Sequence, residues 1–129
     1  MLGELIGETR GKRVVRRVLP DGKVEVSFEE AGTFLGVGAT GFGTYSAEVR
    51  PDGTLFGEGQ GVVMTKDGAM ASWKGMGVGK FVGGGVSYRG TLSYYSASPA
   101  LSRLNSVATV FEYDVDEAGN SHTKAWEWK

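Results

Sequence analysis

The sequence predicts an all-β protein, a small antiparallel β-barrel of about eight strands in meander order. Three observations support this fold class. Apolar residues alternate along most of the chain and no long helical pattern is present. Turn signals recur at the spacing of short strands. The 22 glycines of this 129-residue chain gather at every second position in several segments, which strips one face of a strand and lets a sheet curl tightly.

The length and composition of the chain predict one domain spanning residues 1–129, with no linker. A hydrophobic content of 40% with 22% charged residues is typical of a globular protein. The net charge of −1 argues against nucleic acid or an anionic membrane as a partner. The chain has no cysteine, so disulfides, thiolate zinc sites and thiol catalysis are excluded. We predict a cytoplasmic protein with no signal peptide and no membrane span.

Three short turns share one pattern, in which aspartate precedes glycine and, in two of them, proline comes first. Proline sets the first turn position, aspartate suits the second, and glycine takes the left-handed third. This pattern is typical of a three-residue hairpin with a glycine bulge. The turns at 20–22, 51–53 and 66–68 place Leu19 opposite Lys23, Arg50 opposite Thr54 and Thr65 opposite Ala69.

The first hairpin divides into a charged and an apolar face when it is paired from its turn. Arg17 is then opposite Glu25, and Arg13 is opposite Glu29, which are two favourable cross-strand pairs. Arg16 and Glu30 are exceptions on the apolar face: they form a buried pair or an anchor for an acidic ligand, or the ends of this face reach solvent. The apolar residues of this face are Val14, Val18, Val24, Val26 and Phe28.

The same pairing aligns the glycines of the next three strands on one continuous face. This face is small or apolar throughout, apart from the large rings of Tyr45 and Trp73. We interpret it as the barrel interior, where little volume is available. In the inverse assignment Glu48, Glu58 and Gln60 would line a polar cavity and the glycines would pack against a neighbour.

The opposite face of these strands mixes polar groups with large apolar side chains. An apolar patch of this kind on a monomer predicts association with further copies of the chain. We therefore expect a homo-oligomer. The residues that would form the interface are Phe42, Met64, Met70 and Met76.

The last third of the chain continues the strand pattern with one interruption. A glycine-rich turn over 81–85 leads into a strand over 86–96, and Ser98-Pro99 begins a helical turn that ends near Leu104. A strand over 106–116 follows. The turn 117–120 then leads to a final strand containing Trp126 and Trp128.

The segment Gly77-Val78-Gly79-Lys80-Phe81-Val82-Gly83, with Gly90 beyond it, resembles a hairpin of the allene oxide cyclase and dirigent-like barrels. A bacterial domain family of unknown function with that barrel shares the motif. With the compatible stretch from Pro51 to Lys80, the resemblance covers about half of the chain. It implies an eight-stranded barrel, often trimeric, with an apolar cavity that binds or cyclises hydrophobic molecules. No catalytic residue of those families can be matched to a position in this chain.

Aromatic residues on the glycine face are the candidates for binding a ligand. Tyr45, Trp73 and Phe81 lie beside glycines that leave a shaped apolar slot; alternatively, these rings plug the barrel. The candidate catalytic groups are Glu58, Glu30 and Arg16, because a carboxylate in an apolar barrel can act as a general base. The one histidine, His122, is a poor metal site without partners. We expect no metal and no cofactor.

Three functions are compatible with these features. The first is binding of a small hydrophobic ligand inside the barrel. The second is a cyclase-like or isomerase-like enzyme that orients a reactive apolar substrate. The third is a non-catalytic structural oligomer whose barrel is filled. A hollow interior and the side chains that line it would distinguish these functions.

Overall fold

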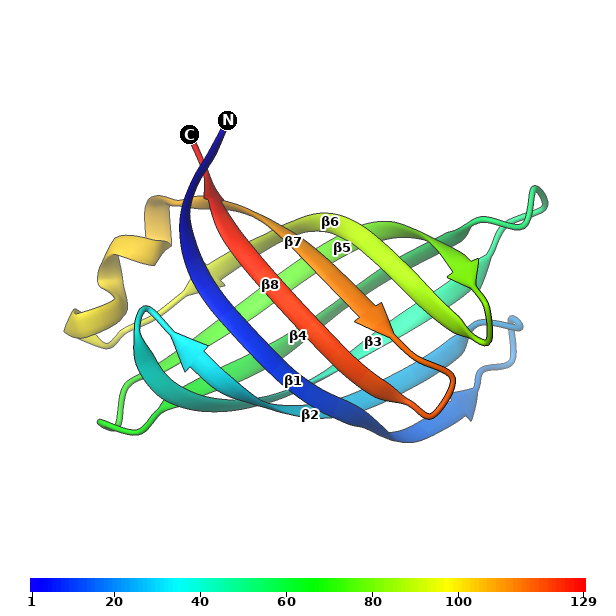
Figure 1. Cartoon of the computed structure of the whole chain (residues 1–129), viewed down its shortest axis with the longest axis horizontal. Helices are drawn as coiled ribbons and strands as arrows, with labels where there is room; N and C mark the ends of the chain where they lie inside the picture. The colour runs from blue at the N-terminus through cyan, green and yellow to red at the C-terminus, as the bar shows by residue number, and fades with distance from the viewer.

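The computed structural model describes all residues from 1 to 129 and confirms the predicted fold class. Eight antiparallel strands form a closed barrel in meander order, because the last strand pairs with the first (Figure 1). The strands are β1 (Leu2–Val18), β2 (Val24–Phe34), β3 (Val37–Val49), β4 (Leu55–Thr65), β5 (Met70–Val82), β6 (Gly85–Tyr95), β7 (Ala108–Val115) and β8 (Asn120–Trp128), and a 3-10 helix, η1 (Pro99–Ser106), joins β6 to β7.

The three aspartate–glycine turns form the hairpins that the sequence predicts. The amide of Leu19 donates to the carbonyl of Lys23 at 2.8 Å, and equivalent bonds close the hairpins at Arg50–Thr54 and Thr65–Ala69. The three turn glycines have φ between +86° and +91°. L-residues rarely adopt this conformation, so glycine is required there. These turns determine the pairing of the strands on either side.

The paired strands β3, β4 and β5 turn their glycines toward the barrel axis. Gly43 is opposite Gly61, Tyr45 is opposite Gly59, and Gly61 is in turn opposite Trp73. The inverse assignment is therefore wrong. The polar side chains of this sheet, such as Glu58 and Gln60, are exposed on the outside.

The space next to the interior glycines is occupied by side chains from neighbouring strands. A methyl carbon added at Gly61 would lie 2.5 Å from Cζ2 of Trp73, and one at Gly43 would lie 2.7 Å from the same atom. Gly57 and Gly79 make similar room for the Tyr88 ring. The glycines thus allow large rings to lie flat against the barrel wall.

The first hairpin departs from the predicted pairing at a β-bulge between Arg13 and Val15. The pair Arg17–Glu25 is confirmed, with 3.3 Å between Nη2 and Oε1. Beyond the bulge the register shifts by one residue, so Arg13 is opposite Phe28 and not Glu29. Val14 is the extra residue and is exposed, which removes it from the predicted apolar face. Val18 is also exposed, at the end of β1.

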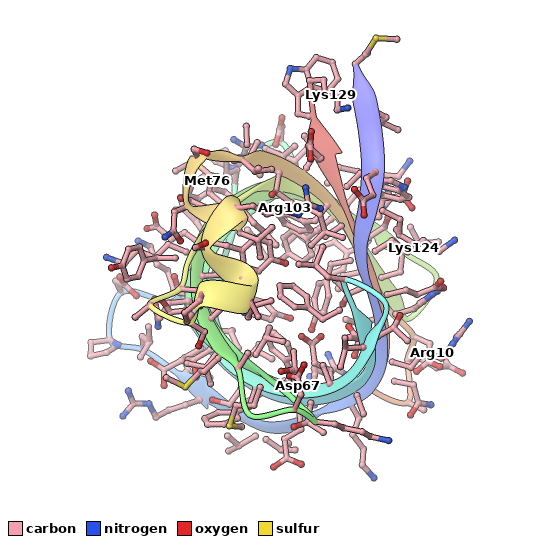
Figure 2. All side chains as sticks on the ribbon, turned by 90° about the vertical axis from the view of Figure 1, so that its left-hand side faces the viewer. Arg10, Asp67, Met76, Arg103, Lys124 and Lys129 are labelled. Atoms are coloured by element: carbon pink, nitrogen blue, oxygen red, sulfur yellow. The ribbon has the colours of Figure 1, made fainter.

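Each end of the barrel has its own apolar core. At one end η1 lies across the opening, with Leu101 and Leu104 buried against Phe34 and Tyr94 (Figure 2). The other core contains Leu55, Tyr88, Tyr113 and Val115. The middle of the barrel lies between these two cores. The helical segment η1 is too short to span a membrane.

The apolar side chains on the outer face form two groups, and not the single patch that the sequence predicts. The polar row Thr44–Gln60–Lys74 separates them. The first outer patch contains Phe42, Val62, Met64 and Met70, and the second contains Phe56, Met76 and Val78.

We predict that Gly61→Ala lowers the free energy of unfolding by about 1–3 kcal/mol, because the new methyl group overlaps the Trp73 ring. Gly38→Ala in β3 is a matched control, since its methyl group meets only the flexible end of the Lys66 side chain. Urea denaturation of both variants measures the difference. Equal stability of the two variants would show that the ring does not need the glycine.

Candidate ligand-binding cavity in the barrel

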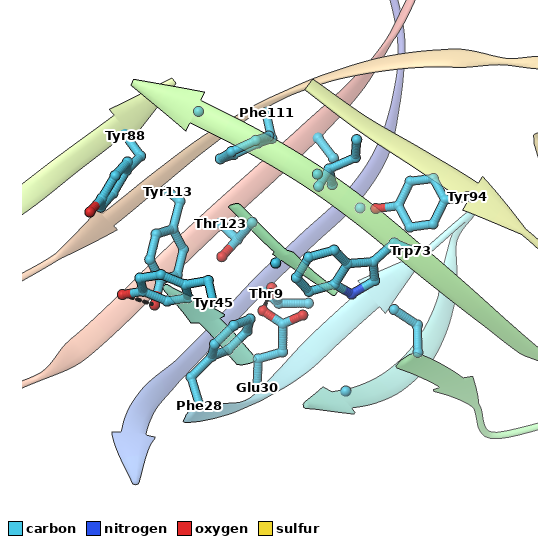
Figure 3. A pocket seen from close by; sticks show the side chains of 18 of the residues that line it. Thr9, Phe28, Glu30, Tyr45, Trp73, Tyr88, Tyr94, Phe111, Tyr113 and Thr123 are labelled. Atoms are coloured by element: carbon cyan, nitrogen blue, oxygen red, sulfur yellow. Dashed lines mark hydrogen bonds between the residues drawn. The ribbon is translucent and has the colours of Figure 1, made fainter. Parts of the chain in front are cut away.

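An aromatic cavity of about 90 Å³ lies in the middle of the barrel. Residues from all eight strands surround it (Figure 3). The interior is therefore hollow in part, although large rings occupy much of it. The principal lining rings are Phe28, Tyr45, Trp73, Tyr94, Phe111 and Tyr113.

Phe28 joins the lining rings into one packed cluster. Its centroid is 5.5 Å from that of Tyr113, 6.0 Å from that of Tyr45 and 6.2 Å from that of Trp73. The Tyr113 hydroxyl donates to the Tyr45 hydroxyl at 3.4 Å. Burial raises the pKa of both tyrosines, so they are neutral phenols at physiological pH.

Glu30 places a carboxyl group in this aromatic cavity. It follows Val26 and Phe28 on the inward face of β2, because alternate residues of a strand share a face. The Thr9 hydroxyl donates to Oε2 of Glu30 at 2.8 Å. Burial raises the pKa of Glu30, and the hydroxyls of Thr9 and Thr123 oppose the rise. No lysine, arginine or histidine lines the cavity, so the carboxylate has no counter-ion there.

Thr123 on β8 supplies a second polar group to the cavity. Its Oγ1 atom is buried and has no partner that meets normal hydrogen-bond geometry, although the hydroxyl lies near enough to Glu30 to lower the pKa of that carboxyl group. Figure 3 shows this side chain and those of Thr9 and Glu30 within the ring of aromatic residues. Buried hydroxyl groups without partners are uncommon in proteins. The cavity therefore combines an apolar wall with a small polar centre that the protein does not fully satisfy.

The barrel architecture recurs in bacterial proteins of unknown function. A protein from Clostridium acetobutylicum superimposes with a TM-score of 0.82 at 13% identity, covering 98% of this chain and 99% of its own. A β-barrel-like protein from Acinetobacter baumannii gives a TM-score of 0.82 at 14% identity, with 100% and 96% covered. A conserved protein from Rhodopseudomonas palustris gives 0.80 at 12% identity, with 99% and 98% covered. At such identities the likeness extends to the fold alone.

No protein-family model matches the chain, and no curated protein matches it either. The structural neighbours are consistent with the predicted bacterial barrel of unknown function. They do not confirm the resemblance to the allene oxide cyclase and dirigent-like barrels.

The three predicted ligand-binding aromatics do not lie together. Tyr45 and Trp73 both line the cavity. Phe81 does not: its side chain is 56% exposed. It shares the strand face of Trp73, but it lies next to the turn at Gly83 and Gly84, where β5 and β6 leave the packed interior. The alternation of side chains along β5 predicted the correct face for Phe81, but it could not show where the packed interior ends.

The three predicted catalytic candidates are also separated. Glu58 borders the cavity, but the residue is exposed on the outer face of β4. Arg16 is opposite Val26 near one end of the barrel and is exposed. Only Glu30 directs its carboxyl group into the cavity.

Several lining residues were absent from the predicted site. Tyr88, Tyr94 and Tyr113 fall on strand faces that the alternation of apolar residues predicts, but their faces could be joined into one cavity only after the barrel closed. No sequence feature marked Thr9 and Thr123 as lining residues, because threonine is common in β-strands.

His122 lies outside the cavity and contacts Glu8, with 2.7 Å between Nε2 and Oε2. This hydrogen bond lowers the pKa of Glu8. No group of three His, Asp or Glu side chains is arranged to hold a metal ion.

We predict that Glu30 makes the folded protein less stable as pH rises above the ordinary glutamate pKa of 4.5. The folded state holds the Glu30 proton more tightly than the unfolded state, so stability is lost as pH rises through the raised pKa. Each tenfold change in the ionisation constant corresponds to about 1.4 kcal/mol.

The measurement is the difference in urea stability between wild type and Glu30→Gln from pH 4 to pH 8. Subtraction removes the contributions of the other carboxyl groups, which the two proteins share. Glu30→Gln should gain stability relative to wild type as pH rises. A difference that stays constant with pH would contradict the raised pKa.

Proposed function

We propose that this protein binds a small, mainly apolar molecule inside the barrel. The observation that supports the proposal is the cavity itself: aromatic rings enclose a space that also contains a carboxyl group and an unpartnered hydroxyl. Ligand sites are usually apolar concavities with a few polar groups that orient the ligand. A barrel that served only as a rigid body would gain stability by filling this space with apolar side chains.

The volume of the cavity limits the size of the ligand. About 90 Å³ is less than the roughly 150 Å³ of an engineered apolar cavity that accepts benzene. A molecule of a few heavy atoms therefore fits without displacing side chains. A larger ligand requires rotation of lining rings such as Tyr45 or Trp73.

Catalysis is the second candidate function, and Glu30 is the observation that favours it. A carboxyl group whose pKa is raised by burial is a stronger base than an exposed one and can exchange a proton with a bound ligand. Under this alternative the barrel acts as a cyclase-like or isomerase-like enzyme on an apolar substrate. The aromatic wall would orient the substrate, and Glu30 would be the acid or base.

We also propose that the protein associates with further copies of itself through the first outer patch. Phe42 and Met70 are each more than half exposed there, and Met64 lies beside them on β4. Burial of such side chains against another copy removes apolar surface from water. We also propose a cytoplasmic location, which is compatible with a chain that has no cysteine.

Ligand binding predicts that small apolar probes enter the cavity of the wild-type protein. In a titration with dissolved xenon, an apolar probe small enough for the cavity, followed by ¹H–¹⁵N NMR, we expect saturable shifts in the Trp73 indole signal and in the amides around Phe28 and Phe111. Val63→Phe fills the cavity from β4 and should abolish these shifts. The matched control is Val62→Phe, since Val62 is the next residue and faces outward.

The wild-type titration is decisive if Val63→Phe fails to fold, because the location of the shifts does not depend on the variant. Shifts spread over the outer surface, or no shifts at all, would exclude the cavity as a binding site.

Self-association predicts a mass above 13.7 kDa for the native protein. We expect Phe42→Lys to shift the population toward monomer, because a charge cannot be buried in the apolar interface. Met76→Lys in the second outer patch is the control and should leave the mass unchanged. Native mass spectrometry measures all three proteins, and a monomeric wild type at about 100 µM would overturn the proposal.

A further inference from the structure

We propose that the cavity selects a small organic cation, in the form of a short primary alkylammonium ion, through the carboxylate of Glu30. This inference rests on the proposed binding function and specifies the chemical class of its ligand. The geometry of the cavity supports it in three steps: an unpaired carboxylate, the ring faces around it, and a free acceptor beside it.

The first step is the lack of a counter-ion. The Glu30 carboxyl group has only neutral hydroxyl neighbours: Thr9 donates to Oε2 at 2.8 Å, and Thr123 also lowers the pKa of Glu30. The arginines near the barrel end, Arg13 and Arg16, affect the pKa of Tyr45, but neither affects that of Glu30. Transfer of an unpaired carboxylate out of water is costly. A cationic ligand supplies the charge that the protein itself does not place there.

The second step is the aromatic surroundings. Phe28 and Trp73 are stacked with 29° between their planes, and both line the cavity together with Glu30. Glu30 lines the cavity together with Tyr94 and Tyr113, which belong to the apolar cores at the two ends of the barrel. The negative face of an aromatic ring attracts a cation placed over it. The wall that disfavours the bare carboxylate therefore favours its ion pair with an organic cation.

The third step is hydrogen bonding. An ammonium group has three N–H donors and no acceptor. The buried Thr123 Oγ1 accepts no hydrogen bond from the protein, and the Glu30 carboxylate keeps lone pairs free beside the hydroxyls of Thr9 and Thr123. The alkyl part then occupies the apolar remainder of the cavity, and its length is limited by the volume of about 90 Å³. An anionic ligand would instead be repelled by Glu30.

The test compares three probes of similar size and different charge: n-butylammonium, 1-butanol and butyrate. Their dissociation constants are measured by ¹H–¹⁵N NMR at pH 7.5 and constant ionic strength. We expect wild type to bind butylammonium at least about tenfold more tightly than butanol, and butyrate the most weakly. In Glu30→Gln the ratio of butylammonium to butanol affinity should fall to about one.

Two further variants separate this role from a general structural effect. Glu58→Gln removes the exposed carboxyl group that borders the same cavity, and it should keep the preference for the cation. Thr123→Val keeps the shape of the side chain and should weaken butylammonium more than butanol. In wild type, the carboxyl ¹³C signal of Glu30 should report a lower pKa when butylammonium is bound, because the cation favours the carboxylate.

The outcomes distinguish this inference from the function on which it rests. If butanol binds in the cavity as tightly as butylammonium, or if Glu30→Gln keeps the preference for butylammonium, the inferred selection of a cation by Glu30 is wrong. The proposed binding function then still stands. If xenon and all three probes fail to bind, the binding function itself is wrong. Should Glu30→Gln fail to fold, the three wild-type affinities and the ¹³C titration still decide the matter.

Discussion

Volume inside a closed eight-stranded sheet is the constraint on which the rest of this structure depends. An eight-stranded barrel is just wide enough for side chains to fill it, so large rings inside it need small residues beside them. The glycines of β3, β4 and β5 meet this requirement. Gly43 and Gly61 make room for Trp73, and Gly57 and Gly79 make room for Tyr88. The aromatic interior and the glycine-rich sequence are therefore two aspects of one packing solution.

The same constraint creates the cavity. Trp73 and Tyr88 pack beside the interior glycines, and the two apolar cores lie on either side of the middle of the barrel. A space of about 90 Å³ remains between the two cores. The inward row of β2 continues through Val26 and Phe28 to Glu30 at this level. A carboxyl group consequently lies where the surroundings are most apolar, and its pKa rises.

The parts of the fold that the sequence predicts are those with a local cause. The aspartate–glycine turns determine three hairpins, and alternation then places Tyr45 and Trp73 on the inside. The parts that could not be predicted depend on where the barrel ends and on which strands meet across it. Phe81 has the right face but lies outside the packed region. Tyr94 and Tyr113 lie opposite Trp73 and Tyr88 on neighbouring strands, but they meet the β2 rings Phe34 and Phe28 only because β8 returns to β1.

The incorrect prediction with the greatest consequence is the pairing of β1 with β2, because it did not include the single extra residue in β1. Paired from its turn without a bulge, β1 would place Lys12 opposite Glu30, and the carboxylate would have a counter-ion. The bulge at Val14 shifts the register, so Lys12 is opposite Glu29 and Gly11 is opposite Glu30.

Glycine is required at that position, since a methyl group on Gly11 would overlap the backbone carbonyl of Glu29. No turn residue or composition signal marks the bulge. Directly opposed residues share a face of the sheet. Without the bulge, Lys12 and Glu30 would form an ion pair inside the barrel; with it, Glu30 is opposite Gly11 and has no cationic partner. The proposed affinity for a cation therefore depends on a bulge that removes the protein's own cation from the cavity.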